Sequence, residues 1–375
     1  MTDAATIARL NLDPYLDWCA AEGVPIAGGI ALDLFSVDVG DWARIGAKGA
    51  IVNFNGRGDF TNMFLSELPA GGSTTQQQHL YEEVFFVLDG RGSTQVELGD
   101  GTRRSFEWGP RSFFAVPLNA KHRHFNGSGS QRARLVSTSN FPLMINTFHC
   151  EEFIFGGVQF SFTDRFGKRE HYAGEGELHL IRQGNNVWET NFVPDMAELP
   201  LTDYSDRGPG SSNIKFVLAD GLMYAHMSEI APATYKKGHR HMEGVHVLTL
   251  TGGGYSLLWW EGETDFTRVD WKYGTVFPPL ENQFHQHFVT SQEPSRYVAT
   301  AIGSLRYPWT KRQRDFNFAG KDGKKHGSTR SIKDGGGQIE YEDQDPRIHQ
   351  IWLEEMRKAG VTPRFEGPGN LVPVT

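Results

Sequence analysis

"GHRHMEGVHVLTLTGGG", residues 238–254, contains three histidines within one short stretch. His239 and His241 are two residues apart, and side chains at that spacing on a strand point to the same face. The segment "MEGV" that follows is typical of a short turn, which would bring His246 around on the next strand. This spacing favours a cluster of imidazoles over separate surface histidines.

A second histidine pair occurs further along the chain in "NQFHQHF", residues 282–288. His285 and His287 again share one face of a predicted strand. Three or four imidazoles that converge from antiparallel strands inside a barrel would form a site for a divalent transition metal. Imidazole suits Fe(II), Ni, Cu or Zn better than Mg or Ca.

The two halves of the chain repeat one another. Residues 66–68 match 228–230 at an offset of 162, and the first histidine pair follows that offset, with Gln77 opposite His239 and His79 opposite His241. Beyond the histidines, the identities are aligned at an offset of 163: Gly90 with Gly253, Trp108 with Trp271, His122 with His285, and His124 with His287. The same offset places Glu83 opposite His246. We therefore predict an internal duplication, with two all-β domains in tandem.

Both copies resemble the cupin superfamily. Its first motif is a glycine, His-x-His, three or four residues, Glu, six residues and Gly; its second is Gly, Pro, a small turn residue, His, three residues and Asn. The first copy reads "QQHLYEEVFFVLDG" and "GPRSFFAVPLNAKHRHFN", with departures at Gln77 and Asn119. The second reads "GHRHMEGVHVLTLTGG" and "YGTVFPPLENQFHQHFV", with departures at His246 and Val289.

The resemblance implies two tandem cupin barrels of the double-stranded β-helix, or jelly-roll, type. It also implies the metal ligands His239, His241, His246 and His285, and more weakly Gln77, His79, Glu83 and His122. It does not fix a reaction, since cupins include dioxygenases, isomerases, decarboxylases, lyases and non-catalytic storage proteins. Bicupins loosely labelled as ethanolamine-utilisation accessory proteins are also similar.

Several residues have more than one possible role. His246 is expected to be a fourth ligand or a base beside a three-histidine site, and Glu243 in the turn is the competing carboxylate. His124 and His287 could orient a ligand from outside the metal shell, or cap a strand end. We take His246 and His287 as the catalytic candidates. Arg240 and Lys272 could offset a substrate carboxylate, or be solvated surface charges.

The predicted domain order follows from the strand-like runs and the flanking helical patterns. Residues 1–35 form an N-terminal helical segment with a helix over 13–22, and residues 345–359 form a terminal helix. Residues 311–337 are predicted to be a mostly basic surface loop, and residues 155–205 to be irregular. The predicted units are 1–35, a first barrel 36–160, a connecting segment 161–205, a second barrel 206–310 and a C-terminal extension 311–375.

Composition limits the classes of partner. The net charge of −8 argues mildly against nucleic acid, and no apolar stretch reaches the length of a membrane span. With only Cys19 and Cys150, no disulfide framework is expected, and the N-terminus lacks a signal-peptide pattern. We expect a cytoplasmic protein and a homo-oligomer.

The predicted function is that of a metal-dependent enzyme acting on a small, anionic, aromatic or enolic molecule. Fe(II) is the favoured metal, with Ni, Mn, Zn or Cu as alternatives, and the favoured chemistry is O2-dependent cleavage by a dioxygenase. One alternative is a non-oxidative isomerase, lyase or decarboxylase in which the metal polarises a carbonyl. Another is a non-catalytic ligand-binding or accessory protein.

Overall fold

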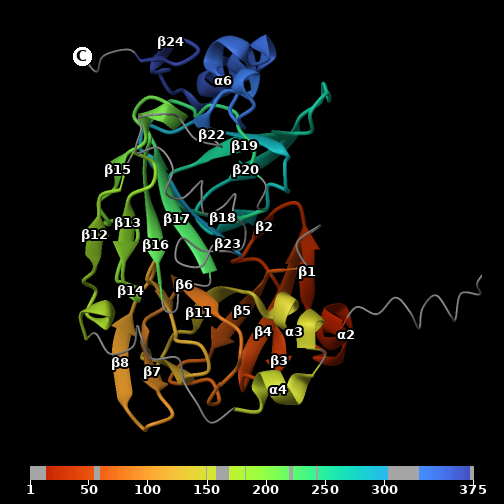
Figure 1. The fold of residues 1–375 in the computed structure, drawn as a ribbon, viewed down its shortest axis with the longest axis vertical. Helices are drawn as coiled ribbons and strands as arrows, with labels where there is room; N and C mark the ends of the chain where they lie inside the picture. The colour runs from red at the N-terminus through yellow and green to blue at the C-terminus, as the bar shows by residue number, and fades with distance from the viewer. Residues whose placement is uncertain are drawn as a thin grey trace, which may run out of the picture.

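The computed structural model shows two β-barrels stacked along the long axis of the molecule (Figure 1). It describes residues 14–54, 60–148, 150–157, 169–181, 183–218, 223–241, 244–302 and 329–371. Both barrels are jelly rolls, so the predicted all-β fold of two tandem cupin-type barrels is confirmed. Within the described ranges, no helix has the length and hydropathy to cross a bilayer.

The first barrel contains most of the strands of the N-terminal half. They are β1 (Ile26–Gly29), β3 (Gly40–Trp42), β4 (Ala47–Phe54), β5 (Asn62–Leu68), β6 (Glu83–Asp89), β7 (Gly92–Glu97), β8 (Arg103–Trp108), β9 (Phe113–Ala115), β10 (Lys121–Asn126) and β11 (Ala133–Ser139). The larger sheet has the order β1-β4-β5-β11-β6-β9, with β3 on β4, and it faces the sheet β10-β7-β8.

The second barrel repeats this arrangement. Its strands are β12 (Glu177–His179), β13 (Val187–Glu189), β15 (Thr202–Asp203), β16 (Ser212–Val217), β17 (Met223–Ile230), β18 (His246–Thr251), β19 (Gly254–Trp259), β20 (Thr267–Trp271), β21 (Thr275–Phe277), β22 (Phe284–Val289) and β23 (Ser295–Ile302). The order β13-β16-β17-β23-β18-β21 faces β20-β19-β22. The prediction that residues 155–205 are irregular is wrong, because β13 and β15 in that stretch correspond to β1 and β3.

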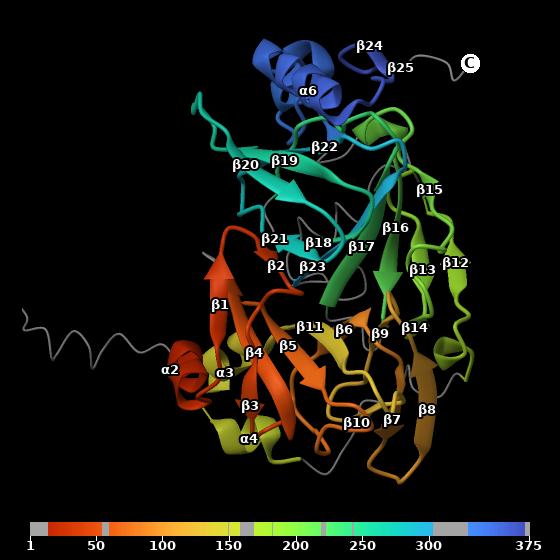
Figure 2. The ribbon, with the colours of Figure 1, turned by 180° about the vertical axis from the view of Figure 1, so that it is seen from behind.

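Each barrel also receives one strand from the leading segment of the other repeat. β2 (Leu32–Asp33) leaves the N-terminal segment and pairs with β21 of the second barrel. β14 (Phe192–Val193) leaves the connecting segment and pairs with β9 of the first barrel. The exchange is reciprocal, since β9 and β21 occupy the same place in their barrels, and it lies between the barrels in Figure 2.

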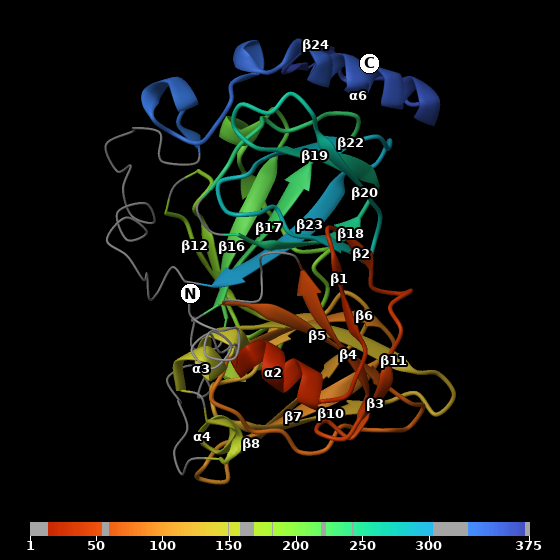
Figure 3. The same cartoon turned by 90° about the vertical axis from the view of Figure 1, so that its right-hand side faces the viewer.

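Helices lie at one end of the molecule, beyond the second barrel, and along the side of the first barrel (Figure 3). The predicted N-terminal helix is confirmed as α2 (Pro14–Ala21), which lies beside α3 (Phe141–Phe148) and α4 (Glu151–Phe155). The predicted terminal helix is confirmed as α6 (Pro346–Ala359), capped by the Asp345 side chain. The other elements within the described ranges are the 3-10 turns η1 (Arg169–Tyr172), η2 (Ser205–Arg207), η4 (Ile332–Asp334) and η5 (Tyr341–Asp343), and the hairpin β24 (Phe365–Gly367) and β25 (Asn370–Leu371).

A shared apolar core fills the space between the two large sheets. Alternate residues of β6 and β18, such as Phe86 and Leu248, point into this core. Thr138 and Thr300, which are equivalent positions in the two repeats, share a hydrogen bond of 2.9 Å there. Equivalent residues meet in this way only near a two-fold axis, so the barrels are related by an approximate dyad.

Strand pairing fixes how the repeats align. In the first barrel Val136 pairs with Phe86, and in the second Val298 pairs with Leu248. Val136 therefore corresponds to Val298, and Phe86 to Leu248, each at an offset of 162. The offset remains 162 as far as β7 and β19, because Gly92 and Gly254 occupy the same position opposite a tryptophan. The extra residue enters only in the hairpins that follow.

Candidate metal centre

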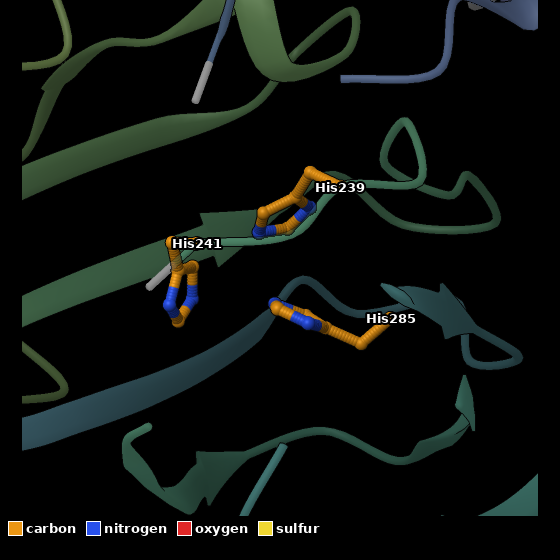
Figure 4. A group of neighbouring side chains, drawn as sticks. All are labelled: His239, His241 and His285. Atoms are coloured by element: carbon orange, nitrogen blue, oxygen red, sulfur yellow. The ribbon is translucent and has the colours of Figure 1, made fainter. Parts of the chain in front are cut away.

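Three histidines converge inside the second barrel (Figure 4). His239 and His241 lie on the segment between β17 and β18, and His285 lies on β22. One ligand nitrogen from each lies within 4.8 Å of the others. The His285 ring centroid lies 4.2 Å from that of His239 and 5.0 Å from that of His241. Three of the predicted ligands are therefore brought together.

Backbone carbonyls orient two of these rings. The Nδ1 atoms of His239 and His285 each lie 3.1 Å from a carbonyl oxygen, that of Lys237 and that of Gln283 respectively. A carbonyl only accepts, so each Nδ1 carries the proton, and each Nε2 presents a lone pair to the cluster. Burial, reinforced by Arg207 and the neighbouring histidines, lowers the pKa of His239 well below its usual value. Neutral imidazoles with converging lone pairs are the donor set that a divalent transition metal requires.

His246 is not part of this cluster, contrary to the sequence prediction. It is the first residue of β18, and its ring packs 5.7 Å from that of Phe54, in the core between the barrels. The alignment at an offset of 163 was one residue too long at this point. The true counterpart of Glu83 is Val245, which points into the second barrel with Val247. A slip of one residue in a strand exchanges its two faces, and this explains the error. The competing carboxylate, Glu243, lies outside the described residues.

A β-bulge in the segment between β17 and β18 determines which of its side chains face the barrel interior. The Lys236 N–H donates to the His287 carbonyl, and the His239 N–H to that of His285. Between these two rungs, Lys237 and Gly238 on one side oppose Gln286 alone on the other. Both Lys236 and His239 therefore face the barrel interior. The first barrel has the same bulge, with Thr74 opposite His124 and Gln77 opposite His122.

The turn before the second motif histidine explains one departure from the cupin pattern. Asn119 and Asn282 have φ values of 60° and 59°, where a glycine would be expected. Each N–H donates to the carbonyl of the inner histidine, His79 in one barrel and His241 in the other. Asn is among the few non-glycine residues that adopt this conformation readily, so the turn is preserved.

The first barrel holds a different group, formed by His79, Glu83 and His122, all buried. Glu83 lies 3.0 Å from His79 Nε2 and accepts a hydrogen bond from Ser137. Although burial raises the pKa of Glu83, the hydrogen bond and charge of His79 hold it below its usual value. Burial, with His79 nearby, lowers the pKa of His122 to about 4. The Glu83 carboxylate and His79 Nε2 are close enough to hold a metal ion together with His122.

Gln77, the other predicted ligand of the first barrel, turns its amide away. Its Nε2 donates to the Arg44 carbonyl at 3.0 Å and to Thr75 Oγ1 at 2.7 Å. Aromatic side chains close this side of the barrel, where Tyr81 stacks on His79 at 3.6 Å and contacts Phe141 of α3. The first group is therefore enclosed more tightly by its own chain.

His287 and His124 are held in identical hydrogen-bonded chains. Trp271 donates to Ser256 Oγ at 3.0 Å, which lies 2.7 Å from His287 Nδ1. Trp108, Thr94 and His124 repeat the same distances in the first barrel. Since the hydroxyl accepts from the indole, it donates to Nδ1, and the imidazole proton is on Nε2. These histidines are fixed interior groups next to the clusters. Of the two alternatives for them, this position is that of groups outside the metal shell rather than of strand-end caps.

The cations near the second cluster differ from those that the sequence suggested. Arg240 forms an ion pair with Glu261 and stacks on Phe284, and Lys272 pairs with Asp33, so both are engaged elsewhere. Lys236 and Arg207 are buried instead. Burial, with Arg207 nearby, lowers the pKa of Lys236 well below its usual value. The sequence contains a signal for Lys236: it stands three residues before the motif histidine His239, where the first copy has Thr74.

One protein-family model matches part of the chain. Residues 64–139 match the model of the cupin domain. This match covers the core of the first barrel, from β5 to β11, and it is to a cupin domain. Because the second barrel repeats the strand order of the first, the fold of the chain is of the bicupin type.

Solved structures similar to this bicupin include vicilin from hazelnut, Corylus avellana, at 8% identity, covering 73% of this chain and 85% of that chain with a TM-score of 0.46. They also include a formate complex of oxalate decarboxylase from Lactobacillus farciminis, at 10% identity, 76% and 89% coverage and a TM-score of 0.49. Oxalate decarboxylase from Bacillus subtilis is similar at 10% identity, 73% and 76% coverage and a TM-score of 0.46. No curated protein sequence matches the chain.

Proposed function

We propose that this bicupin is an Fe(II)-dependent dioxygenase that acts on a small, anionic, aromatic or enolic molecule in its second barrel. The observation that carries the proposal is the open ligand set, in which three imidazoles converge and Val245 stands where the other barrel has Glu83. A divalent metal held by three imidazoles would supply three open octahedral positions, two for a chelating substrate and one for O2.

The residues around the cluster support binding and orientation of such a substrate. His287, held by Ser256, presents its Nε2–H on the same interior face as His285. Its ring lies 6.0 Å from Phe277 and 5.0 Å from Tyr297, so an aromatic surface adjoins the ligand set. An apolar pocket with a few fixed polar groups is typical of a site for a small organic molecule.

Oxygen stoichiometry tests this proposal. The Fe(II)-loaded protein is assayed for oxygen uptake against catechol-, gentisate- and diketone-type compounds, and we expect one O2 consumed for each substrate molecule. The matched control is His285→Ala, in which uptake should fall to the background level.

Turnover that proceeds equally well without oxygen would contradict the dioxygenase reaction. It would instead favour the non-oxidative alternative, in which the metal polarises a carbonyl in an isomerase, lyase or decarboxylase reaction.

A further inference from the structure

Lys236 is a buried lysine inside the second barrel, 1% exposed. Its Nζ lies 3.3 Å from Tyr297 Oη and 5.0 Å from the centre of the Tyr297 ring. That ring contacts His287, which in turn lies 5.4 Å from His285 of the ligand cluster. Lys236 is therefore one aromatic side chain away from the interior histidines.

The position of Lys236 relative to the cluster follows from the bulge. The rung that joins Lys236 to His287 is two residues along β22 from the rung that joins His239 to His285. At about 3.3 Å per residue, the two rungs are about 7 Å apart. A small molecule could therefore contact the cluster with one end and Lys236 with the other.

Among the residues that the structure describes, no carboxylate forms an ion pair with Lys236. The larger charged influence on Lys236 is Arg207, also a cation, whose guanidinium donates to Gln338 and Tyr204. The weaker one is Glu229, whose carboxylate forms an ion pair with Arg296. A buried ammonium that has no carboxylate paired with it is unfavourable, because burial removes its hydration. Such a group persists where a ligand supplies the missing charge.

The two barrels differ in their charge at equivalent positions. Strand pairing equates Lys236 with Thr74 and Tyr297 with Leu135, so the first barrel has neither the ammonium nor the phenol. It has the carboxylate of Glu83 instead, where the second barrel has Val245. The charge of a divalent metal would thus be partly balanced by the chain in the first barrel, and increased by Lys236 in the second.

We propose that Lys236 binds a second anionic group of the substrate, so that the second barrel takes small molecules with a chelating pair of oxygens at one end and a carboxylate at the other. This inference rests on the proposed metal-dependent function for the chelating end only. The carboxylate end depends on Lys236 and Tyr297, which are present without metal.

Calorimetric titration with dicarboxylates and their monoamides tests the inference. Succinate and glutarate are titrated into Zn(II)-loaded protein and compared with succinamate and glutaramate, which keep the shape and lose one charge. We expect the wild type to bind at least one dicarboxylate tenfold or more tightly than its monoamide. Lys236→Met should remove that preference and should raise the melting temperature of the ligand-free protein, since a buried cation is replaced by an apolar side chain.

Lys237→Met is the matched control, because Lys237 is the next residue but pairs with Glu340. It should keep the preference. Lys236→Gln provides a second neutral side chain, and it should behave like Lys236→Met. A preference that survives both substitutions at Lys236, or a wild type with no preference, would overturn the inference.

A parallel titration of metal-free protein with acetate and acetamide separates this inference from the proposed function. If the histidine cluster binds no metal, a preference for acetate that depends on Lys236 still supports the anion site. If metal binds and neither acetate nor the dicarboxylates depend on Lys236, the anion site is rejected while the metal site stands.

Discussion

Replacing His285 by alanine should remove metal from the second barrel, whereas replacing His246 by alanine should leave the metal content unchanged. His285 supplies one of three converging nitrogens, and loss of one ligand should weaken binding by more than about 100-fold, since even residues that only orient a ligand contribute about 10- to 100-fold. His246 lies on the other face of β18, against Phe54.

Elemental analysis after dialysis against a mild chelator measures this difference, with circular dichroism as the check that both variants are folded. His239→Ala should behave like His285→Ala. Retention of full metal content in both of these variants would reject the assigned site. Loss of metal in His246→Ala alone would restore the ligand set predicted from the sequence.

Glutamate introduced at positions 245 and 246 should have opposite effects. Val245→Glu places a carboxylate in the barrel interior, where Glu83 stands in the first barrel, so metal should bind about tenfold or more tightly because the carboxylate lowers the net positive charge of the site. It should also lower turnover, because one open position is filled. Without metal this variant should be less stable than the wild type, because its carboxylate is buried among apolar residues.

His246→Glu instead places the carboxylate in the apolar core between the barrels. It should lower the free energy of unfolding by about 2–4 kcal/mol, and added metal should not restore it. Thermal unfolding with and without Zn(II) distinguishes the two variants. A metal-induced rise in melting temperature that is larger for His246→Glu than for Val245→Glu would contradict the structural alignment. Val245→Glu combined with Ala299→Ser, which supplies the counterpart of Ser137, should bind metal best.

Much of the fold and part of the site could be predicted from the sequence. The histidine spacing and the repeated tryptophans and glycines predict two equivalent barrels and place His239, His241 and His285 together. Residue identities alone could not locate where the extra residue enters the second repeat. The run of three glycines at 252–254 allows Gly90 to be aligned with Gly253. Strand pairing instead aligns Gly90 with Gly252, because Asp89 and Thr251 occupy equivalent positions at the bulges of the two barrels. This single position determines whether His246 or Val245 faces the metal cluster.

Other features depend on contacts between distant segments. Lys236 and Lys237 are consecutive lysines in the sequence. Nothing in the local sequence shows that Lys236 points into the barrel while Lys237 pairs with Glu340. The bulge that separates them is defined by pairing with β22, far along the chain. The helices α3 and α4 were likewise not predicted, because their stability comes from aromatic packing of Phe141 and Phe155 against Trp18.

The reciprocal pairing of β2 with β21 and of β14 with β9 makes the chain a covalently linked equivalent of an arm-exchanged dimer. Neither half, cut from the other, would have a complete large sheet, because each would lack the strand that its partner donates. Two such fragments should remain soluble together better than apart and should reassemble on mixing. In the intact chain, unfolding of one barrel would remove a paired strand from the other barrel. The two barrels should therefore unfold in a single cooperative step.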